Sequence, residues 1–145
     1  MTHATIPDHN HVARYCGGKH VEGERVGPTA FHLREGEQSL SVNWIEILSK
    51  QSREEEIDEL RSVYAKKLKR VGSTAKIAVM NVGVVRASVF AKCSIGLAFL
   101  HDPLPEDPSH SGIYEIPPDG EMEVIGELIA ETVNEVYPAV QSEAR

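Results

Sequence analysis

Two segments of the chain carry apolar residues at helical spacing along one side only. The first begins at Ser52-Arg53-Glu54-Glu55, a capping-box pattern in which the serine and the glutamate satisfy each other's exposed backbone N–H groups. Gly72 is well placed to end this segment. We predict a helix over residues 52–72, whose apolar side needs a sheet or another helix to cover it. Its apolar positions are Ile57, Leu60, Tyr64, Leu68 and Val71.

The second one-sided helix follows the turn Pro117-Pro118-Asp119-Gly120, and Pro138 is expected to stop it. A helix with one apolar and one acidic side lies at the surface of a protein and packs against a neighbouring layer. The apolar side consists of Ile125, Leu128, Ile129, Thr132, Val133 and Val136, and the opposite side carries Glu123, Glu127, Glu131 and Asn134.

Short segments that alternate between apolar and polar residues, or that are wholly apolar, surround these helices and predict strands. Gly17-Gly18 ends the first of them, and Glu35-Gly36 turns the chain after the second. The third runs directly into a helical turn, and a short helix is expected over residues 84–92. The six segments are 11–16, 29–33, 40–45, 76–82, 97–100 and 111–116.

Strands at both ends of a long helix, with a second helix closing the chain, are typical of a sheet covered by helices. We therefore predict an α+β fold in which a single layer of five or six strands packs against two main helices. The length of 145 residues fits a single domain, 1–145. The polar residues 1–10 are expected to form a loose N-terminal tail.

The formal charge of −7 argues against nucleic acid as a partner, because an acidic surface repels phosphate backbones. A basic cluster at Lys66, Lys67, Lys69 and Arg70 closes a helix that starts with acids, so it complements the helix dipole. The longest apolar stretches, 77–85 and 95–100, are shorter than the ~20 residues of a spanning helix, and no membrane attachment is expected. The first residues lack the basic start and apolar run of a secretory signal, which predicts a cytoplasmic protein.

Two cysteines, Cys16 and Cys93, are expected to be reduced thiols that pack as small core residues. Cys16 also lies among His9, His11 and His20, and imidazole and thiolate are the usual zinc ligands. The spacing matches none of the paired clips of strong zinc sites, and His11 and Cys16 project to opposite faces of the predicted strand. We therefore predict no metal and no cofactor, and the sequence leaves metal binding by these four residues open.

Arg14 lies in the middle of an otherwise apolar predicted strand, beside Tyr15. An arginine buried there needs a partner, and its planar fork suits a carboxylate or a phosphate. Arg14 and Tyr15 are therefore candidate ligand-binding residues. The alternatives for Arg14 are an ion pair with one of the 22 acidic residues, or a side chain that faces water.

Ser41 and Asn43 share one side of the predicted strand 40–45, with Trp44 on the other side. Two short polar groups on one face can orient a ligand, although a polar sheet face is the simpler explanation. A serine nucleophile needs an adjacent base and a third, orienting group, and the sequence contains no Gly-x-Ser-x-Gly elbow. We take Ser41 as a candidate catalytic residue and Asn43 as a candidate ligand-binding residue.

A loop with three prolines carries His101 at its start and His110 at its end. Prolines limit the freedom of the loop, so both imidazoles are expected at fixed positions. Histidine is the usual acid or base at neutral pH, and loops on a rigid scaffold are where sites tend to lie. His110 is the candidate catalytic acid or base and His101 a candidate ligand-binding residue, against the alternative that both only cap backbone groups.

Several of these pieces, taken in order, resemble small uncharacterised bacterial proteins with a Leu-Ser-Val motif and a late Asp-Pro…Asn-Pro-x-His motif before a short strand. The chain departs from this pattern at Val84-Val85, where Gly-Glu-Val is expected, and at Asp107, where asparagine is usual. The resemblance implies no activity, but it implies that Ser41, His110 and Arg14 share one region. The matching pieces are Arg14-Tyr15, Phe31, Leu40-Ser41-Val42, the strand 77–82 and the segment from Asp102-Pro103 to Pro108-Ser109-His110.

Two functions of different classes fit these features. The leading hypothesis is a non-catalytic interaction or accessory protein of a larger bacterial system, indicated by the lack of a catalytic signature, the acidic surface and the small size. The alternative is an enzyme or binder of a small phosphate-bearing ligand: Arg14 clamps the anion, Ser41 and Asn43 orient the ligand, and His110 is the acid or base. That alternative requires Arg14, Ser41 and His110 to converge on a shared cleft.

Overall fold

The computed structural model of the protein describes residues 3–118 and 120–140. The described residues form three α-helices, which are α1 (Arg53–Lys67), α2 (Val82–Cys93) and α3 (Glu121–Thr132). They also form eight strands, which are β1 (His11–Cys16), β2 (Val21–Glu22), β3 (Arg25–Val26), β4 (Ser39–Trp44), β5 (Lys76–Asn81), β6 (Ala98–His101), β7 (His110–Tyr114) and β8 (Glu135–Pro138). Short 3₁₀ helices span Gly18–His20, Pro28–Phe31 and Glu46–Leu48.

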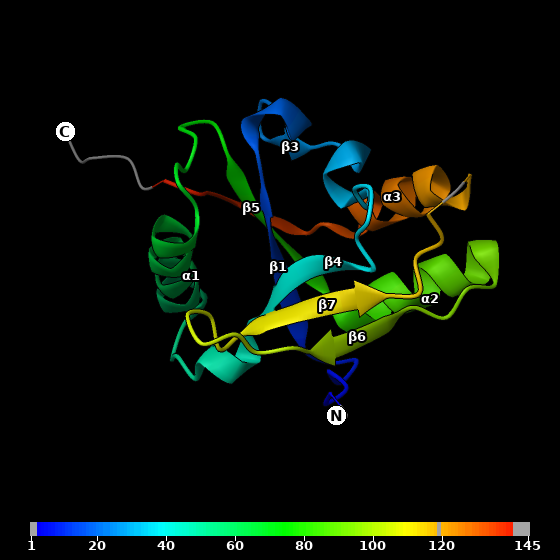
Figure 1. Ribbon diagram of the computed structural model, residues 1–145, viewed down its shortest axis with the longest axis horizontal. Coiled ribbons are helices and arrows are strands. Elements are labelled where there is room, and N and C mark those ends of the chain that lie inside the picture. Colours follow the sequence, from blue (N-terminus) through cyan, green and yellow to red (C-terminus); the bar gives the residue numbers. More distant parts are fainter. Residues whose placement is uncertain (1–2, 119, 141–145) are drawn as a thin grey trace.

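Six of the strands form one sheet in the order β6-β7-β4-β1-β5-β8, in which each pair of neighbours is antiparallel. The strands β2 and β3 form a separate hairpin. The sheet and its helices confirm the predicted α+β fold, and the six strands of the main sheet lie within the five or six expected (Figure 1). None of the described helices is long and apolar enough to cross a lipid bilayer.

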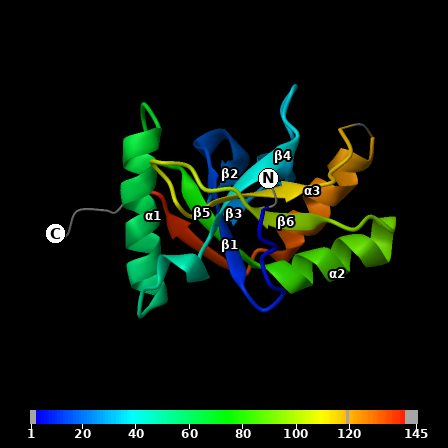
Figure 2. The same ribbon diagram turned by 60° about the horizontal axis from the view of Figure 1, so that its bottom comes forward.

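Helices cover both faces of this sheet. On one face, Ile57, Leu60 and Tyr64 of α1 pack in a core with Ala13 and Ile77 of the sheet. On the other face, α2 and α3 share a larger core with the other side of the same strands, so the two helices lie across the sheet from α1 (Figure 2). The short helix expected over residues 84–92 is thus a full third helix, α2, rather than a minor connection.

Ser52 caps α1 as predicted, because its Oγ accepts a hydrogen bond from the backbone N–H of Glu55 at 3.1 Å. The reciprocal bond differs from the capping box: Glu55 Oε1 accepts from the N–H of Gln51 and not of Ser52. The expected continuation to Gly72 is wrong, since α1 ends at Lys67 and Leu68 is already extended. Leu68 and Val71 still pack against the α1 core, but from the loop that follows the helix.

The strand expected over residues 29–33 is also wrong, because Pro28–Phe31 is a 3₁₀ helix. Pro28 occupies its first turn, where the fixed φ of proline favours helical backbone. Ala30 and Phe31 are both buried although they are consecutive, which a half-buried strand does not allow.

The second predicted helix is shorter than expected. The helix α3 ends at Thr132, and Val136 lies in β8, where it pairs with Ala78. Val133 and Val136 pack against the same core as α3, so their apolar character fits either structure. Pro138 ends the edge strand β8 rather than the helix, a position that sheets tolerate. The last predicted strand, 111–116, is β7 (His110–Tyr114), and β8 follows it.

The expectation of a loose tail over residues 1–10 is wrong for residues 4–10, while residues 1–2 lie outside the described part. The backbone N–H of Ile6 donates to the carbonyl of Phe99 at 2.9 Å, and the N–H of His101 donates to the carbonyl of Ala4 at 2.8 Å. Ile6 is buried in the core. Residues 4–6 therefore run along the outer edge of β6.

One part of the sheet carries no helix on the α1 side. In Figure 1, β4, β7 and β6 lie in front of α2 and α3, while α1 stands to the left over β1 and β5. The register pairs Ser41 with Gly112 and Asn43 with His110, so these residues share this face. We call the solvent-facing side of β4, β7 and β6 the open sheet face.

Candidate functional site

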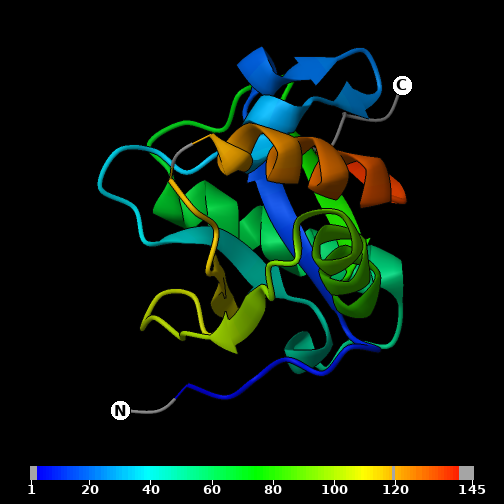
Figure 3. The ribbon, with the colours of Figure 1, turned by 90° about the vertical axis from the view of Figure 1, so that its right-hand side faces the viewer.

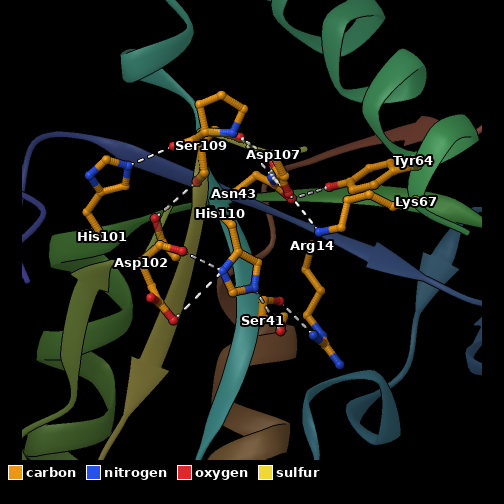
Figure 4. A network of polar contacts seen from close by, with 12 residues as sticks. Arg14, Ser41, Asn43, Tyr64, Lys67, His101, Asp102, Asp107, Ser109 and His110 are labelled. Atoms are coloured by element: carbon orange, nitrogen blue, oxygen red, sulfur yellow. Dashed lines mark hydrogen bonds and ion pairs between the residues drawn. The ribbon is translucent and has the colours of Figure 1, made fainter. Parts of the chain in front are cut away.

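A network of polar side chains is centred on Asp107, in the proline-containing loop before β7. The Asp107 carboxylate is fully buried, and it accepts hydrogen bonds from Asn43 Nδ2 at 3.0 and 2.9 Å and from Ser109 Oγ at 3.0 Å. Lys67 Nζ lies 2.8 Å from the same carboxylate, and Tyr64 donates its hydroxyl to Asn43 Oδ1 at 2.8 Å (Figure 4). The network ties the loop to β4 and to the end of α1.

The charge of Asp107 is compensated inside this network. Burial on its own raises the pKa of the Asp107 carboxyl, but the bonds from Lys67, Asn43 and Ser109 outweigh it, and the pKa lies below its ordinary value. Burial, together with this carboxylate, raises the pKa of Tyr64, which keeps the phenol a hydrogen-bond donor. The network therefore holds the loop in place as an ionised cluster at neutral pH.

This fixed loop presents His110 to Ser41 on the open sheet face. His110 Nδ1 lies 2.8 Å from the backbone carbonyl of Asp102, which can only accept, so Nδ1 carries the proton. In the neutral ring, Nε2 is then an acceptor, and it lies 3.3 Å from Ser41 Oγ. The Asp102 carboxylate is 4.0 Å from Nδ1. The Ser41 hydroxyl, the His110 imidazole and the Asp102 carbonyl that orients the ring thus follow one another in space. This is the arrangement that activates a serine nucleophile.

Arg14 lies where β1 and β4 separate, since these two strands pair over only two residues each. Its Nε donates to the carbonyl of Ala30 at 2.6 Å, and its Nη1 donates to the carbonyl of Ser41 at 2.7 Å. Burial lowers the pKa of the guanidinium. The partners of Arg14 are backbone carbonyls. None of the three roles considered from the sequence, which are ligand binding, an ion pair and exposure to water, involves such partners. The Arg14 side chain thus bonds to backbone groups where the pairing of β1 with β4 has ended.

The structure brings Arg14, Ser41 and His110 into one region, because both other residues contact Ser41 (Figure 4). They reach it differently: His110 faces its hydroxyl, whereas Arg14 bonds to its main chain. Ser41 itself is exposed. The hydroxyl and the imidazole are the parts of this arrangement that face solvent on the open sheet face.

The other candidate residues lie apart from this pair. The Asn43 side chain is committed to Asp107, Ser109 and Tyr64. The Tyr15 hydroxyl accepts from the N–H of Gly72 at 3.3 Å. His101 is on the opposite face of the sheet from His110, where its Nε2 meets the carbonyl of Pro108 at 2.8 Å and its ring stands edge-on to Trp44. His101 thus contacts the backbone, as the capping alternative proposed.

The residues considered as zinc ligands are also separated. His11 Nδ1 lies 2.6 Å from Glu46 Oε2, and the His20 ring bonds to Thr29. Cys16 is buried in the core on the other face, and burial raises the pKa of its thiol to about 11. Within residues 3–118 and 120–140, no group of three or more His, Cys, Asp or Glu side chains is arranged to hold a metal ion.

Sequence reasoning missed four members of the Asp107 network as a cooperating group: Tyr64, Lys67, Asp107 and Ser109. The sequence pattern indicates Tyr64 as one more apolar position of a helix, and Lys67 as part of a basic cluster that complements the helix dipole. Their positions carried a signal, since Tyr64 and Lys67 are three apart in the sequence and share one side of α1. The hairpin β2–β3 was missed as well.

That hairpin forms one wall of a groove of about 690 Å³, and α3 forms the other. Figure 3 shows the hairpin lying along α3. We call its apolar residues the floor: Val26, which is buried, and Ala130, Val133 and Val136, which are half-buried. Four glutamates line the groove as well: Glu22 and Glu24 on the hairpin and Glu127 and Glu131 on α3. We call this the hairpin–α3 groove.

No protein-family model, no curated protein and no solved structure matches this chain.

Proposed function

We propose that the protein is a non-catalytic interaction protein, an accessory of a larger bacterial system in the cytoplasm, which binds its partner through the hairpin–α3 groove. The observation that carries this proposal is the groove itself, an open hollow of about 690 Å³ with an apolar floor. Apolar and charged side chains both line this hollow, so it offers a partner apolar contact and ion pairing in one place.

The hydrogen bonds of the other candidate residues support the same proposal. Asn43 and Asp107 are bonded within the protein, and Arg14 supports two backbone carbonyls. These hydrogen bonds assign the three residues to the scaffold. The groove, by contrast, lies between two surface elements, and its four glutamates are exposed.

The test uses the purified protein as bait in a lysate of its source cell, in three forms. In the first variant, Ala130→Phe, a phenyl ring occupies the floor of the groove. The matched control is Ala87→Phe, which adds the same ring to an exposed position on α2. We expect one stoichiometric partner with the wild type and with Ala87→Phe, and its loss with Ala130→Phe. Capture of no partner, or equal capture by all three forms, would contradict the proposal.

A second candidate function is favoured by the pair Ser41 and His110. Their 3.3 Å separation supports binding of a small phosphate-bearing ligand at the open sheet face, with the hydroxyl and the imidazole as the groups that contact its oxygens. Arg14 and Asn43 take no part in this version, because their hydrogen bonds are made within the fold.

Nuclear magnetic resonance tests this second candidate through the histidine ring signals. On titration with inorganic phosphate, the His110 ring should shift to saturation, and Ser41→Ala should weaken the response. His101 on the opposite face is the internal control and should not move. A shift of both rings by equal amounts, or one that grows without saturation, would rule out a site at Ser41 and His110.

A further inference from the structure

We propose that the hairpin–α3 groove takes a cationic segment of a partner protein, one in which lysine or arginine residues flank small apolar residues. This inference rests on the proposed function and deepens it, because it names the chemistry of the partner. It is carried by the combination of floor and walls. Neither the apolar floor nor the acidic residues alone would define the occupant.

The acidic residues stand on both sides of the groove. Glu22 and Glu24 belong to the hairpin, Glu127 and Glu131 belong to α3, and all four are exposed. Glu127 and Glu131 are four apart, so they share one side of the helix. A segment lying along the floor therefore passes between two walls of carboxylates.

These carboxylates are poorly compensated from within the protein. Among the described residues, Arg25 is the one cation that lines the groove, and it pairs with Glu22 across the hairpin, which leaves four carboxylates against one guanidinium. Lys76 Nζ lies 3.9 Å from Glu24, which is itself highly exposed, and this is the only ion pair of the four glutamates in the described part of the chain. The local field therefore favours a cation, and its reach is about 8 Å at physiological ionic strength. The overall charge of −7 adds to this preference.

The floor of the groove determines which uncharged residues the bound segment carries. Val26, Ala130, Val133 and Val136 offer apolar contact and no hydrogen-bond donor or acceptor from their side chains. A small hydrated cation gains nothing from such a surface. Apolar side chains of a peptide gain burial there, while the stems of lysine and arginine extend along the walls and place their charged ends beside the glutamates.

A random dodecapeptide library displayed on phage tests this inference. The library is selected on the wild-type protein and counter-selected on Ala130→Phe. We expect the selected peptides to be enriched in lysine and arginine beside small apolar residues. A selected peptide is then measured by fluorescence anisotropy against Glu127→Gln/Glu131→Gln. The matched control is Glu121→Gln/Glu123→Gln, which removes the same charge from the same helix outside the groove.

We expect the groove variant to weaken binding about tenfold, as for two exposed ion pairs, and the control to change it by no more than about twofold. Peptides that need the groove but lack cationic enrichment, or that bind Glu127→Gln/Glu131→Gln normally, would overturn the charge inference and leave the groove's binding function standing. If no peptide is selected, or if counter-selection on Ala130→Phe removes every peptide that binds the wild type, both proposals fail. Thermal melting of each variant checks that it folds.

Discussion

The side-chain amide of Asn43 donates to both carboxylate oxygens of Asp107, at 3.0 and 2.9 Å, across 64 positions of sequence. This contact joins the centre of the sheet to the loop that carries His110. Lys67 reaches the same carboxylate from the end of α1. One buried anion therefore determines where a strand, a helix and a loop meet.

We predict that Asp107→Ala destabilises the protein by about 3–5 kcal/mol, because it leaves the Lys67 ammonium and the Asn43 amide without their buried partner. The matched control is Asp8→Ala. Asp8 forms an ion pair of similar length with Arg86, 2.7 Å against 2.8 Å, but at the surface. That change should cost about 0–1 kcal/mol. Urea unfolding measures both, and equal losses would show that the Asp107 network does not hold the loop.

The same carboxylate predicts a dependence of stability on pH. The folded-state pKa of Asp107 lies below its ordinary value of 3.8. Its contribution to stability is therefore fully present above that value and is lost as the pH falls through the folded pKa. The difference in unfolding free energy between the wild type and Asp107→Asn should be constant above about pH 5 and shrink below about pH 4. Urea titrations over this range measure it, and a difference that grows on acidification would contradict the assignment.

Arg14 is predicted to stabilise the fold through the main chain. Arg14→Lys can retain at most one of the two bonds to Ala30 and Ser41, and hydrogen bonds to charged groups contribute about 1.5–3 kcal/mol each. We expect a loss of that size in urea unfolding. Arg34→Lys, at an exposed position, should have little effect. If Arg14→Lys unfolds like the wild type, the guanidinium does not support these strands.

The two thiols are predicted to differ in reactivity. Cys16 is 1 % exposed, and burial raises its pKa to about 11, so almost no reactive thiolate is present at pH 8. Cys93 is partly exposed. Iodoacetamide should modify Cys93 in the native protein and Cys16 only after unfolding, as read by peptide mass spectrometry. Comparable modification of both in the native state would mean that the Cys16 strand opens readily.

Much of the fold could be predicted from the sequence because the relevant signals are local. The cap at Ser52, the alternation in β1 and the apolar runs of β5 and β6 depend on neighbouring residues, and the structure confirms them. The errors come from longer-range effects. Val136 has the right spacing for α3, but pairing with β5 places it in a strand. Phe31 alternates with Leu33, but Pro28 starts a helical turn there.

The site was predictable only in part, for the same reason. Ser41 and His110 could be proposed from residue type and loop chemistry, and they do lie together. The structural roles of Arg14 and Asn43 could not be predicted from the sequence. Arg14 bonds to the main chain where two strands diverge, and Asn43 bonds to an aspartate 64 positions along the chain. The hairpin–α3 groove had no local signature, since its two walls are brought together by tertiary packing alone.

The most direct test of the central proposal is to map where a bound partner touches the protein. Backbone amide shifts are recorded by nuclear magnetic resonance while ¹⁵N-labelled protein is titrated with the captured partner. We predict perturbations concentrated in residues 21–28 and in α3, around the hairpin–α3 groove. Perturbations centred on Ser41 and His110 instead, with the groove signals unchanged, would contradict the account and move the function to the open sheet face.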